Sequence, residues 1–293
     1  MSSLWQGLER VVRPQEPLAM YTWFQLGGPA EFFAEPTSLE QLREIYRRAR
    51  EAGLPFRVLG EGSNILVRDE GVSGVVVRLS EPEFCRTQID GTTVWAGAGA
   101  RLGRVVTTTV REGLGGLENL VAIPGTMGGA WKGNTGAHGG DIGQWTQSVT
   151  VLTESGDVEE RDRSQLMFTY RRSNIDDPVI LGGRLQLEPE DPRPLSRRLQ
   201  TLWIIRKARQ PMGHQCAGRI FRDPRGTTAA ELIEQAGLRG ARVGGAVVSE
   251  RHANFIVAEP ECTAADVLRL IDLIRTQVSQ RLGIDLELSL EIW

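Results

Sequence analysis

The chain has 293 residues, a net charge of −3 at neutral pH and 40% hydrophobic residues, values of an ordinary globular protein with room for two or three domains. No apolar run approaches the roughly 20 residues of a membrane-spanning helix. The start of the chain lacks the basic and apolar parts of a signal peptide, and no basic block favours nucleic acid. We therefore expect a cytoplasmic protein that binds neither membranes nor nucleic acids.

Cysteine and histidine are few and widely spaced. The cysteines are Cys85, Cys216 and Cys262, and the histidines are His138, His214 and His252. They form no CxxC pair and no cluster, which predicts neither a disulfide framework nor a metal site.

The first 80 residues predict a small lobe of strands around one helix. Residues 30–36 predict a strand, and apolar side chains at helical spacing predict a helix over 38–53. Residues 55–69 follow as strand, glycine-rich loop and strand, and 74–79 as a further strand.

Strands dominate from residue 81 to 190. In chain order we predict a strand at 92–100, a helix at 101–116, a hairpin at 149–162, and a strand pair or one bent strand at 178–189. The proline-rich, charged run 188–194 predicts a linker.

The rest of the chain predicts a separate unit. Its expected elements are an amphipathic helix at 195–210 ended by Pro211, a short helix at 228–237, a strand at 252–259, a helix at 263–283 capped by Thr263, and a closing strand at 286–293. We expect Trp293 to tie that last strand down.

Three glycine-rich segments lie at strand ends: Val58–Asn64, Ile123–Ala130 and the run 133–143. Glycines let backbone N–H groups approach a pyrophosphate without interference from a Cβ atom. The first segment is not a dinucleotide-binding fingerprint, because the chain continues into a strand and not a helix. One such loop alone is typical of a hairpin turn, but three together predict a phosphate-bearing cofactor.

The same segments resemble the FAD-binding lobes of the p-cresol methylhydroxylase/vanillyl-alcohol oxidase group, and most closely the UDP-N-acetylenolpyruvoylglucosamine reductases. The resemblance is carried by 58–79, 96–100 and 116–140, and by the motifs YTWFQLGGPAEFF, FTYRRS, AGLRGARVGGAVVSERHANFIV and ELSLEIW. It extends from residue 20 to 293, and the length suits the shorter members of the family.

The resemblance implies an α+β fold: a two-lobed FAD-binding unit of the p-cresol methylhydroxylase type, with lobes at 1–80 and 81–192, and a C-terminal α/β substrate-binding domain at 193–293. It also implies an NADPH-dependent enzyme of peptidoglycan synthesis, which we expect to be a monomer. The flavin would give hydride to C3 of the enolpyruvyl group of a UDP-sugar, and C2 would be protonated.

The resemblance, together with the glycine pattern, assigns non-covalent FAD to a set of loop residues. They are Gly60, Glu61, Gly62, Ser63, Asn64, Ile123, Pro124, Gly125, Thr126, Gly128, Gly129, Asn134, Gly136, Gly140 and Ile142. His138 does not match the histidines that attach flavin covalently in the wider group, and we expect it to be a neutral wall residue.

Three residues are candidates for the chemistry. Arg171 in FTYRRS is similar to the family arginine that polarises the substrate carboxylate, a task that suits a permanently charged, forked guanidinium. Glu291 matches the family's C-terminal catalytic glutamate. Arg219 stands where the family has serine, or sometimes cysteine, as the proton donor.

Arg219 departs from the family pattern, because a guanidinium with a pKa above about 12 is a poor proton donor. Asp223 likewise stands where asparagine would contact the UDP part, whereas Lys207 and Arg209 remain available for phosphate. Cys216 lies near Arg219, but nothing in the sequence aims its thiol at C2.

Several readings therefore stay open. C2 is protonated by water or another side chain, the substrate is different and more anionic, or the protein binds flavin and UDP-sugar without turnover. An FAD oxidoreductase with another small substrate and a glycine-rich structural protein are the remaining alternatives.

Overall fold

The chain folds into two compact units. The computed structural model describes residues 3–211 and 215–293. One unit comprises Met1–Gln15, Glu31–Gly60 and Ser73–Ile205, and the other comprises Glu16–Ala30, Glu61–Val72 and Arg206–Trp293. The second unit therefore combines the C-terminal part of the chain with two early segments. The division at 1–80, 81–192 and 193–293 stays a prediction.

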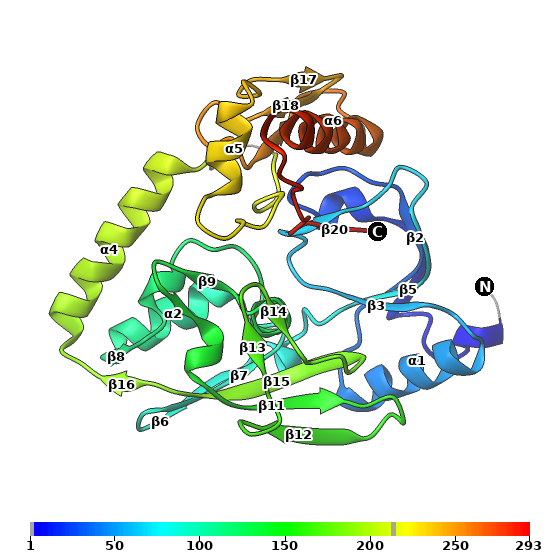
Figure 1. The fold of residues 1–293 in the computed structure, drawn as a ribbon. Coiled ribbons are helices and arrows are strands. Elements are labelled where there is room, and N and C mark those ends of the chain that lie inside the picture. Colours follow the sequence, from blue (N-terminus) through cyan, green and yellow to red (C-terminus); the bar gives the residue numbers. More distant parts are fainter. Residues whose placement is uncertain (1–2, 212–214) are drawn as a thin grey trace. The chain divides into compact units, whose positions relative to one another are not determined.

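The first unit is built on a five-stranded antiparallel sheet (Figure 1). Its strands, in spatial order, are β12 (Val158–Asp162), β11 (Thr146–Leu152), β15 (Val179–Gln186), β7 (Thr93–Gly97) and β6 (Thr87–Asp90). Apolar side chains at alternate positions of β11 are fully buried, as expected of a strand with one face on a core. The helices α2 (Leu102–Arg111) and α3 (Met127–Lys132) bury their apolar faces in the same core.

A second sheet has the order β1 (Val12–Pro17), β2 (Pro29–Ala34), β5 (Val72–Arg78), β3 (Phe56–Leu59), and β3 and β5 run parallel. The helix α1 (Leu39–Glu51) joins β2 to β3. Ser38 begins α1 by accepting a hydrogen bond from the N–H of Gln41, and Gly53 follows it with a φ of 65°.

Short strand pairs complete the first unit. They are β8 (Leu114–Gly115) with β16 (Glu188–Pro189), β9 (Gly136–Ala137) with β10 (Gly140–Asp141), and β13 (Phe168–Thr169) with β14 (Arg172–Ser173). The last two pairs carry candidate site residues.

The second unit packs two helices with a three-stranded sheet. The helices are α5 (Ala229–Gln235) and α6 (Ala264–Leu282), and the strands are β17 (Arg242–Val243), β18 (Ala246–Val248) and β19 (Ile256–Ala258). Both helices begin with a full capping box, at Thr228 and at Thr263. The C-terminal strand β20 (Glu291–Ile292) pairs in parallel with β4 (Ile65–Leu66). The long helix α4 (Pro192–Arg209) contains the point at which the two units divide.

Most predicted elements are present, but the linker at 188–194 and the lengths of some predicted strands were wrong. Residues 188–194 are not a linker, because β16 and the start of α4 occupy them. Two prolines fit there, since a helix tolerates proline in its first turn, and the carboxylate of Asp191 accepts from the N–H of Arg193. Regular strand covers only Ile256–Ala258 of 252–259 and only Glu291–Ile292 of 286–293.

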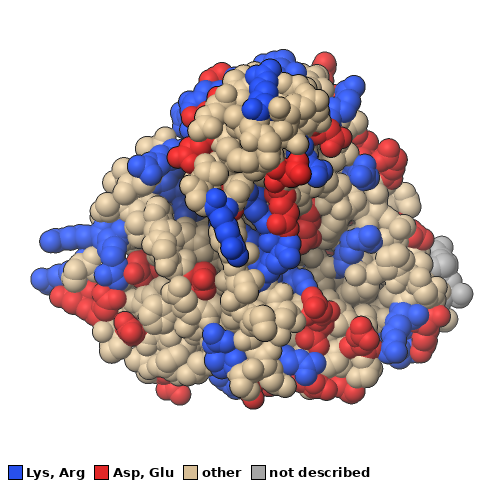
Figure 2. Space-filling model, in the orientation of Figure 1, with Lys and Arg blue, Asp and Glu red and all other residues tan. Residues whose placement is uncertain are grey.

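No helix in the described ranges is long and apolar enough to cross a membrane. On the face drawn in Figure 2, acidic and basic side chains lie interspersed.

Asp69 fastens a loop of the second unit to the start of α6. Its two carboxylate oxygens accept hydrogen bonds from the N–H groups of Ala264 and Ala265, at 2.9 and 3.0 Å. These N–H groups have no partner within the helix, and a negative charge beside them is favourable.

We therefore expect Asp69→Ala to lower the free energy of unfolding by about 1 kcal/mol. Urea denaturation would measure the loss, with Glu70→Ala on the adjacent exposed position as the control. Equal stability of the two variants would contradict the role given to Asp69.

Candidate active site

The first two glycine-rich segments meet within the first unit. A Cβ atom added to Gly60, at the end of β3, would lie 2.8 Å from Oγ1 of Thr126. Glycine is therefore needed for this close approach. The segments Val58–Asn64 and Ile123–Ala130 therefore lie side by side at this contact.

The segment around Thr126 is held by backbone hydrogen bonds to the turn after β7. The N–H of Met127 donates to the carbonyl oxygen of Ala100 and that of Gly128 to Ala98, at 2.9 and 2.8 Å. Thr126 begins α3, since its side chain accepts from the N–H of Gly129. Gly129 has only the Thr126 hydroxyl within 4 Å of a built Cβ, so the backbone is open to a ligand there. The backbone around Thr126 is tightly packed and leaves space beside Gly129, an arrangement that suits the binding of a dinucleotide pyrophosphate.

We expect Gly60→Ala to lower both stability and FAD affinity, the latter by about tenfold, because the added methyl group must push the Thr126 side chain off α3. Gly103→Ala is the matched control. Gly103 lies in α2 with nothing within 4 Å of a built Cβ, so alanine there should stabilise the protein by about 0.5–1 kcal/mol. Thermal unfolding and flavin titration would test the pair, and equal FAD affinity in both variants would exclude Gly60 from the cofactor site.

The third glycine-rich segment forms the β9–β10 hairpin. His138 and Gly139 occupy its two-residue turn, both with positive φ, and the His138 side chain is exposed. The amide of Asn119 donates to the carbonyl oxygen of Ala137 and packs against Gly140. Ile142 is fully buried in the core, so its side chain packs there. The assignment of FAD to this hairpin stays a prediction.

Arg171 lies in the two-residue turn between β13 and β14. Its φ is 57°, a left-handed conformation that costs a non-glycine residue about 1 kcal/mol or more. Its guanidinium lies 5.9 Å from the ring centre of Tyr170. Strained backbone at an exposed turn is a feature of functional positions.

In the second unit, three segments that are far apart in the sequence converge. The N–H of Gly218 donates to the carbonyl oxygen of Ser63 at 2.7 Å, and the amide of Asn64 donates to that of Ser289 at 2.8 Å. The N–H of Glu291 donates to the carbonyl oxygen of Asn64 at 3.0 Å. The first glycine-rich segment is thus bonded directly to the strand that carries Glu291 and to the residue before Arg219.

The closing strand is fixed at its end, as expected for Trp293. The backbone N–H of Trp293 donates to Leu66, and its carbonyl oxygen accepts from Arg68, both at 2.9 Å. Its indole N–H lies 3.4 Å from a carboxylate oxygen of Glu291. Backbone hydrogen bonds of Glu291 and Trp293 to the segment 64–68 therefore fix the chain that presents the Glu291 side chain.

Arg219 forms an ion pair with Asp223, at 2.6 Å between Nη1 and Oδ2. The other oxygen of Asp223 accepts from the N–H of Ala229 at the start of α5. The two residues that depart from the family pattern therefore compensate each other's charge.

Asn254 and His252 lie close to the Arg219–Asp223 ion pair. The sequence interpretation missed them because it assigned them to a strand. The buried amide of Asn254 exchanges two hydrogen bonds of 2.8 Å with the backbone of Phe221, which holds the Arg219 segment.

Burial, and then the positive charge of Arg219, lower the pKa of His252. Its ring is therefore neutral at neutral pH. Nδ1 accepts from the N–H of Asn254, which leaves the proton on Nε2.

Two family models match the chain. An FAD binding domain matches residues 30–161, and the C-terminal domain of UDP-N-acetylenolpyruvoylglucosamine reductase matches residues 210–293. A curated UDP-N-acetylenolpyruvoylglucosamine reductase from Rhodopirellula baltica is 41% identical over 288 residues, which are 98% of this chain and 94% of that protein.

The chain belongs to the UDP-N-acetylenolpyruvoylglucosamine reductase family. The relative from Moorella thermoacetica is also 41% identical, over 98% of this chain and 95% of its own. The crystal structure of the Thermus caldophilus enzyme superposes with a TM-score of 0.82 at 36% identity, covering 96% of this chain and 99% of that one. The expected α+β fold of an FAD-binding unit and a C-terminal domain is confirmed.

The structure also describes Cys216, Lys207 and Arg209. Burial raises the pKa of the Cys216 thiol to about 11, so it stays protonated at neutral pH, and it lies 3.6 Å from the carbonyl oxygen of Pro211. Lys207 and Arg209 are exposed near the end of α4. Their contact with phosphate stays a prediction.

The described residues contain no group of three or more His, Cys, Asp or Glu that could hold a metal ion, and His214 lies outside them.

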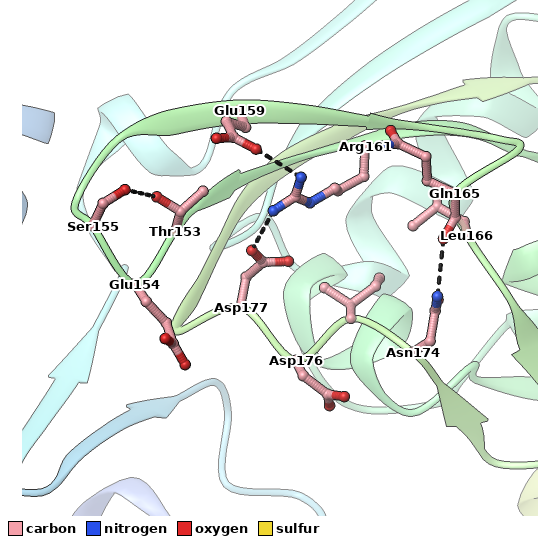
Figure 3. A pocket seen from close by; sticks show the side chains of 11 residues that line it. Thr153, Glu154, Ser155, Glu159, Arg161, Gln165, Leu166, Asn174, Asp176 and Asp177 are labelled. Carbon is pink, nitrogen blue, oxygen red and sulfur yellow. Dashed lines mark hydrogen bonds and ion pairs between the residues drawn. The ribbon is translucent and has the colours of Figure 1, made fainter.

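A hollow of about 590 Å³ lies beside the β11–β12 hairpin, and none of the predicted site residues lines it (Figure 3). Arg161 lies in its wall between the carboxylates of Glu159 and Asp177, at 2.7 and 2.9 Å. The Asn174 side chain bonds the backbone of Gln165. These contacts hold several of the lining side chains against one another or against the adjacent backbone.

Proposed function

We infer that this protein is an FAD-dependent oxidoreductase that uses NADPH to reduce UDP-N-acetylglucosamine enolpyruvate to UDP-N-acetylmuramate in peptidoglycan synthesis. The observation that carries this inference is family membership over nearly the whole chain, at 41% identity. The match to an FAD binding domain, and the contact between Gly60 and Thr126 within it, support the cofactor.

The residues that would hold non-covalent FAD are the backbone of the two adjoining glycine-rich segments and the β9–β10 hairpin. When bound, FAD accepts hydride from NADPH and supplies it to C3 of the substrate. The contribution of the chain is to exclude side chains from the cradle by placing glycine at its closest approaches.

We propose that Arg171 binds the substrate carboxylate with its two-pronged guanidinium and stabilises the negative charge that develops next to it. Glu291 would act beside the reacting double bond, because β20 bonds directly to the first glycine-rich segment. Lys207 and Arg209 would meet the diphosphate.

The residue at the family's proton-donor position is Arg219, so another group must protonate C2. Arg219 cannot supply the proton at neutral pH, and its ion pair with Asp223 holds the guanidinium in a neutralised cluster. The same ion pair favours a second candidate function, in which the protein binds flavin and UDP-sugar without turnover.

An anaerobic two-step experiment separates the two functions. Purified protein should be yellow, and NADPH should bleach its absorbance near 450 nm. Under nitrogen, UDP-N-acetylglucosamine enolpyruvate should then restore the colour. Bleaching without restoration favours the binder, and protein that takes up no FAD overturns both functions.

We further propose that the protein works as a monomer in the cytoplasm. Analytical ultracentrifugation of the FAD-loaded protein would test the oligomeric state.

A further inference from the structure

We propose that Asn134 is a positioning residue that ties the turn carrying Arg171 to the third glycine-rich segment. This deepens the proposed function and rests on it, because it assigns Asn134 to the orientation of Arg171 and not to the flavin.

Asn134 occupies a backbone position where glycine is the usual residue. It follows α3 with a φ of 40°, and its N–H donates to Trp131, while the N–H of Thr135 donates to Ala130. These two bonds form the helix end in which the residue after the cap is left-handed and most often glycine. The backbone alone therefore gives no reason for a side chain here.

The side chain of Asn134 is buried, at 3% exposure, and both of its ends are bonded. Its amide nitrogen donates to the carbonyl oxygen of Thr169 at 2.9 Å, and its carbonyl oxygen accepts from the N–H of Gly143 at 3.1 Å. Thr169 is the residue of β13 that pairs with Arg172 across the turn. One side chain thus joins the segment 133–143 to the Arg171 hairpin.

Further contacts seat the hairpin on the same segment. A Cβ atom at Gly143 would overlap Cβ, Cγ and Cδ2 of Phe168, so this side chain packs directly against the glycine. The hydroxyl of Ser173 donates to the carbonyl oxygen of Lys132 at 2.9 Å. The contacts of Phe168 and Ser173 fix the two strands, whereas Asn134 bonds the residue next to the turn.

The turn needs such support, because Arg171 is itself left-handed and a two-stranded hairpin of this length is marginal alone. A displacement of about 1 Å at a substrate-positioning group can lower a rate by roughly 100-fold. Asn134 therefore sets where the Arg171 guanidinium lies, without contacting the substrate itself.

Asn134→Gly is the decisive variant, since glycine suits the helix end and removes only the two side-chain bonds. Asn134→Asp keeps the shape and the acceptor for Gly143, but loses the donor to Thr169. The control is Glu261→Gly, at an exposed left-handed residue, with a φ of 66°, in the other unit.

Hydrogen–deuterium exchange of the peptide spanning 168–173 gives a readout that needs no substrate. We expect at least about tenfold faster exchange in Asn134→Gly, and wild-type exchange in Glu261→Gly. In the loaded enzyme, reoxidation by the UDP-sugar should slow by roughly 10- to 100-fold. FAD affinity and bleaching by NADPH should stay within about twofold of the wild type.

Wild-type exchange and wild-type reoxidation in Asn134→Gly would overturn the proposal. Weakened FAD binding with unchanged exchange would assign Asn134 to the cofactor and also overturn it. If the wild-type protein fails both half-reactions, the proposed function is wrong instead. The hydrogen–deuterium exchange of the peptide 168–173 would still test the bond between Asn134 and Thr169.

Discussion

Replacing Arg171 by glycine is expected to slow reoxidation of the reduced flavin by the UDP-sugar by about 100- to 1,000-fold, with little change in stability. The loss follows from removing the charge that balances the developing enolate. Stability should hold because glycine relieves the left-handed strain of about 1 kcal/mol, which offsets the greater freedom of glycine in the unfolded chain.

Stopped-flow absorbance near 450 nm and thermal unfolding would measure the two effects on the same preparation. Arg172→Ala, one residue further along the same hairpin, is the control and should keep the wild-type rate. A normal rate in Arg171→Gly would remove this arginine from the mechanism. A large fall in melting temperature would assign it a structural role.

Restoring a serine at position 219 is expected to give its full effect only when Asp223 is neutralised as well. Arg219→Ser alone removes the guanidinium that balances the Asp223 carboxylate, and the remaining negative charge disfavours an anionic substrate. Arg219→Ser should still raise the reoxidation rate if a missing donor limits it. Arg219→Ser with Asp223→Asn should raise it further, by about 100-fold over the wild type.

A double-mutant cycle separates charge balance from proton delivery. For stability, the ion pair should show a coupling of about 1 kcal/mol, since both side chains are partly exposed. For the rate, Arg219→Ala with Asp223→Asn is the matched control, because it neutralises the pair without supplying a hydroxyl. A wild-type or lower rate in the serine double variant would show that Arg219 belongs to a different working mechanism.

The sequence predicted the regular elements well where local signals were strong. Helix α6 begins at its Thr263 cap and ends before Gly283, and the 149–162 hairpin turns at Gly156, as local side-chain chemistry requires. The proline-rich run before α4 misled the interpretation, because proline marks helix starts as well as linkers.

Side-chain contacts in the irregular parts of the chain could not be predicted in the same way. Arg219 and Asp223 lie in irregular chain, where a spacing of four residues carries no expectation of contact. Asn254 appeared to belong to a strand, and its bonds to Phe221 depend on tertiary packing alone. Asn134 was assigned to the FAD site from its glycine-rich surroundings, and its side-chain bonds to Thr169 and Gly143 could not be predicted because they too depend on tertiary packing.

The pairing of β20 with β4 also bears on the order of folding. Asn64 bonds Ser289 across 225 residues, so this contact carries one of the largest loop-closure costs in the chain. On the ribosome, the segment that follows Gly60 cannot reach its final form until almost the whole chain has emerged. The nascent protein is therefore expected to acquire flavin late, and slow docking of the last strand would leave folded but colourless molecules in refolding experiments.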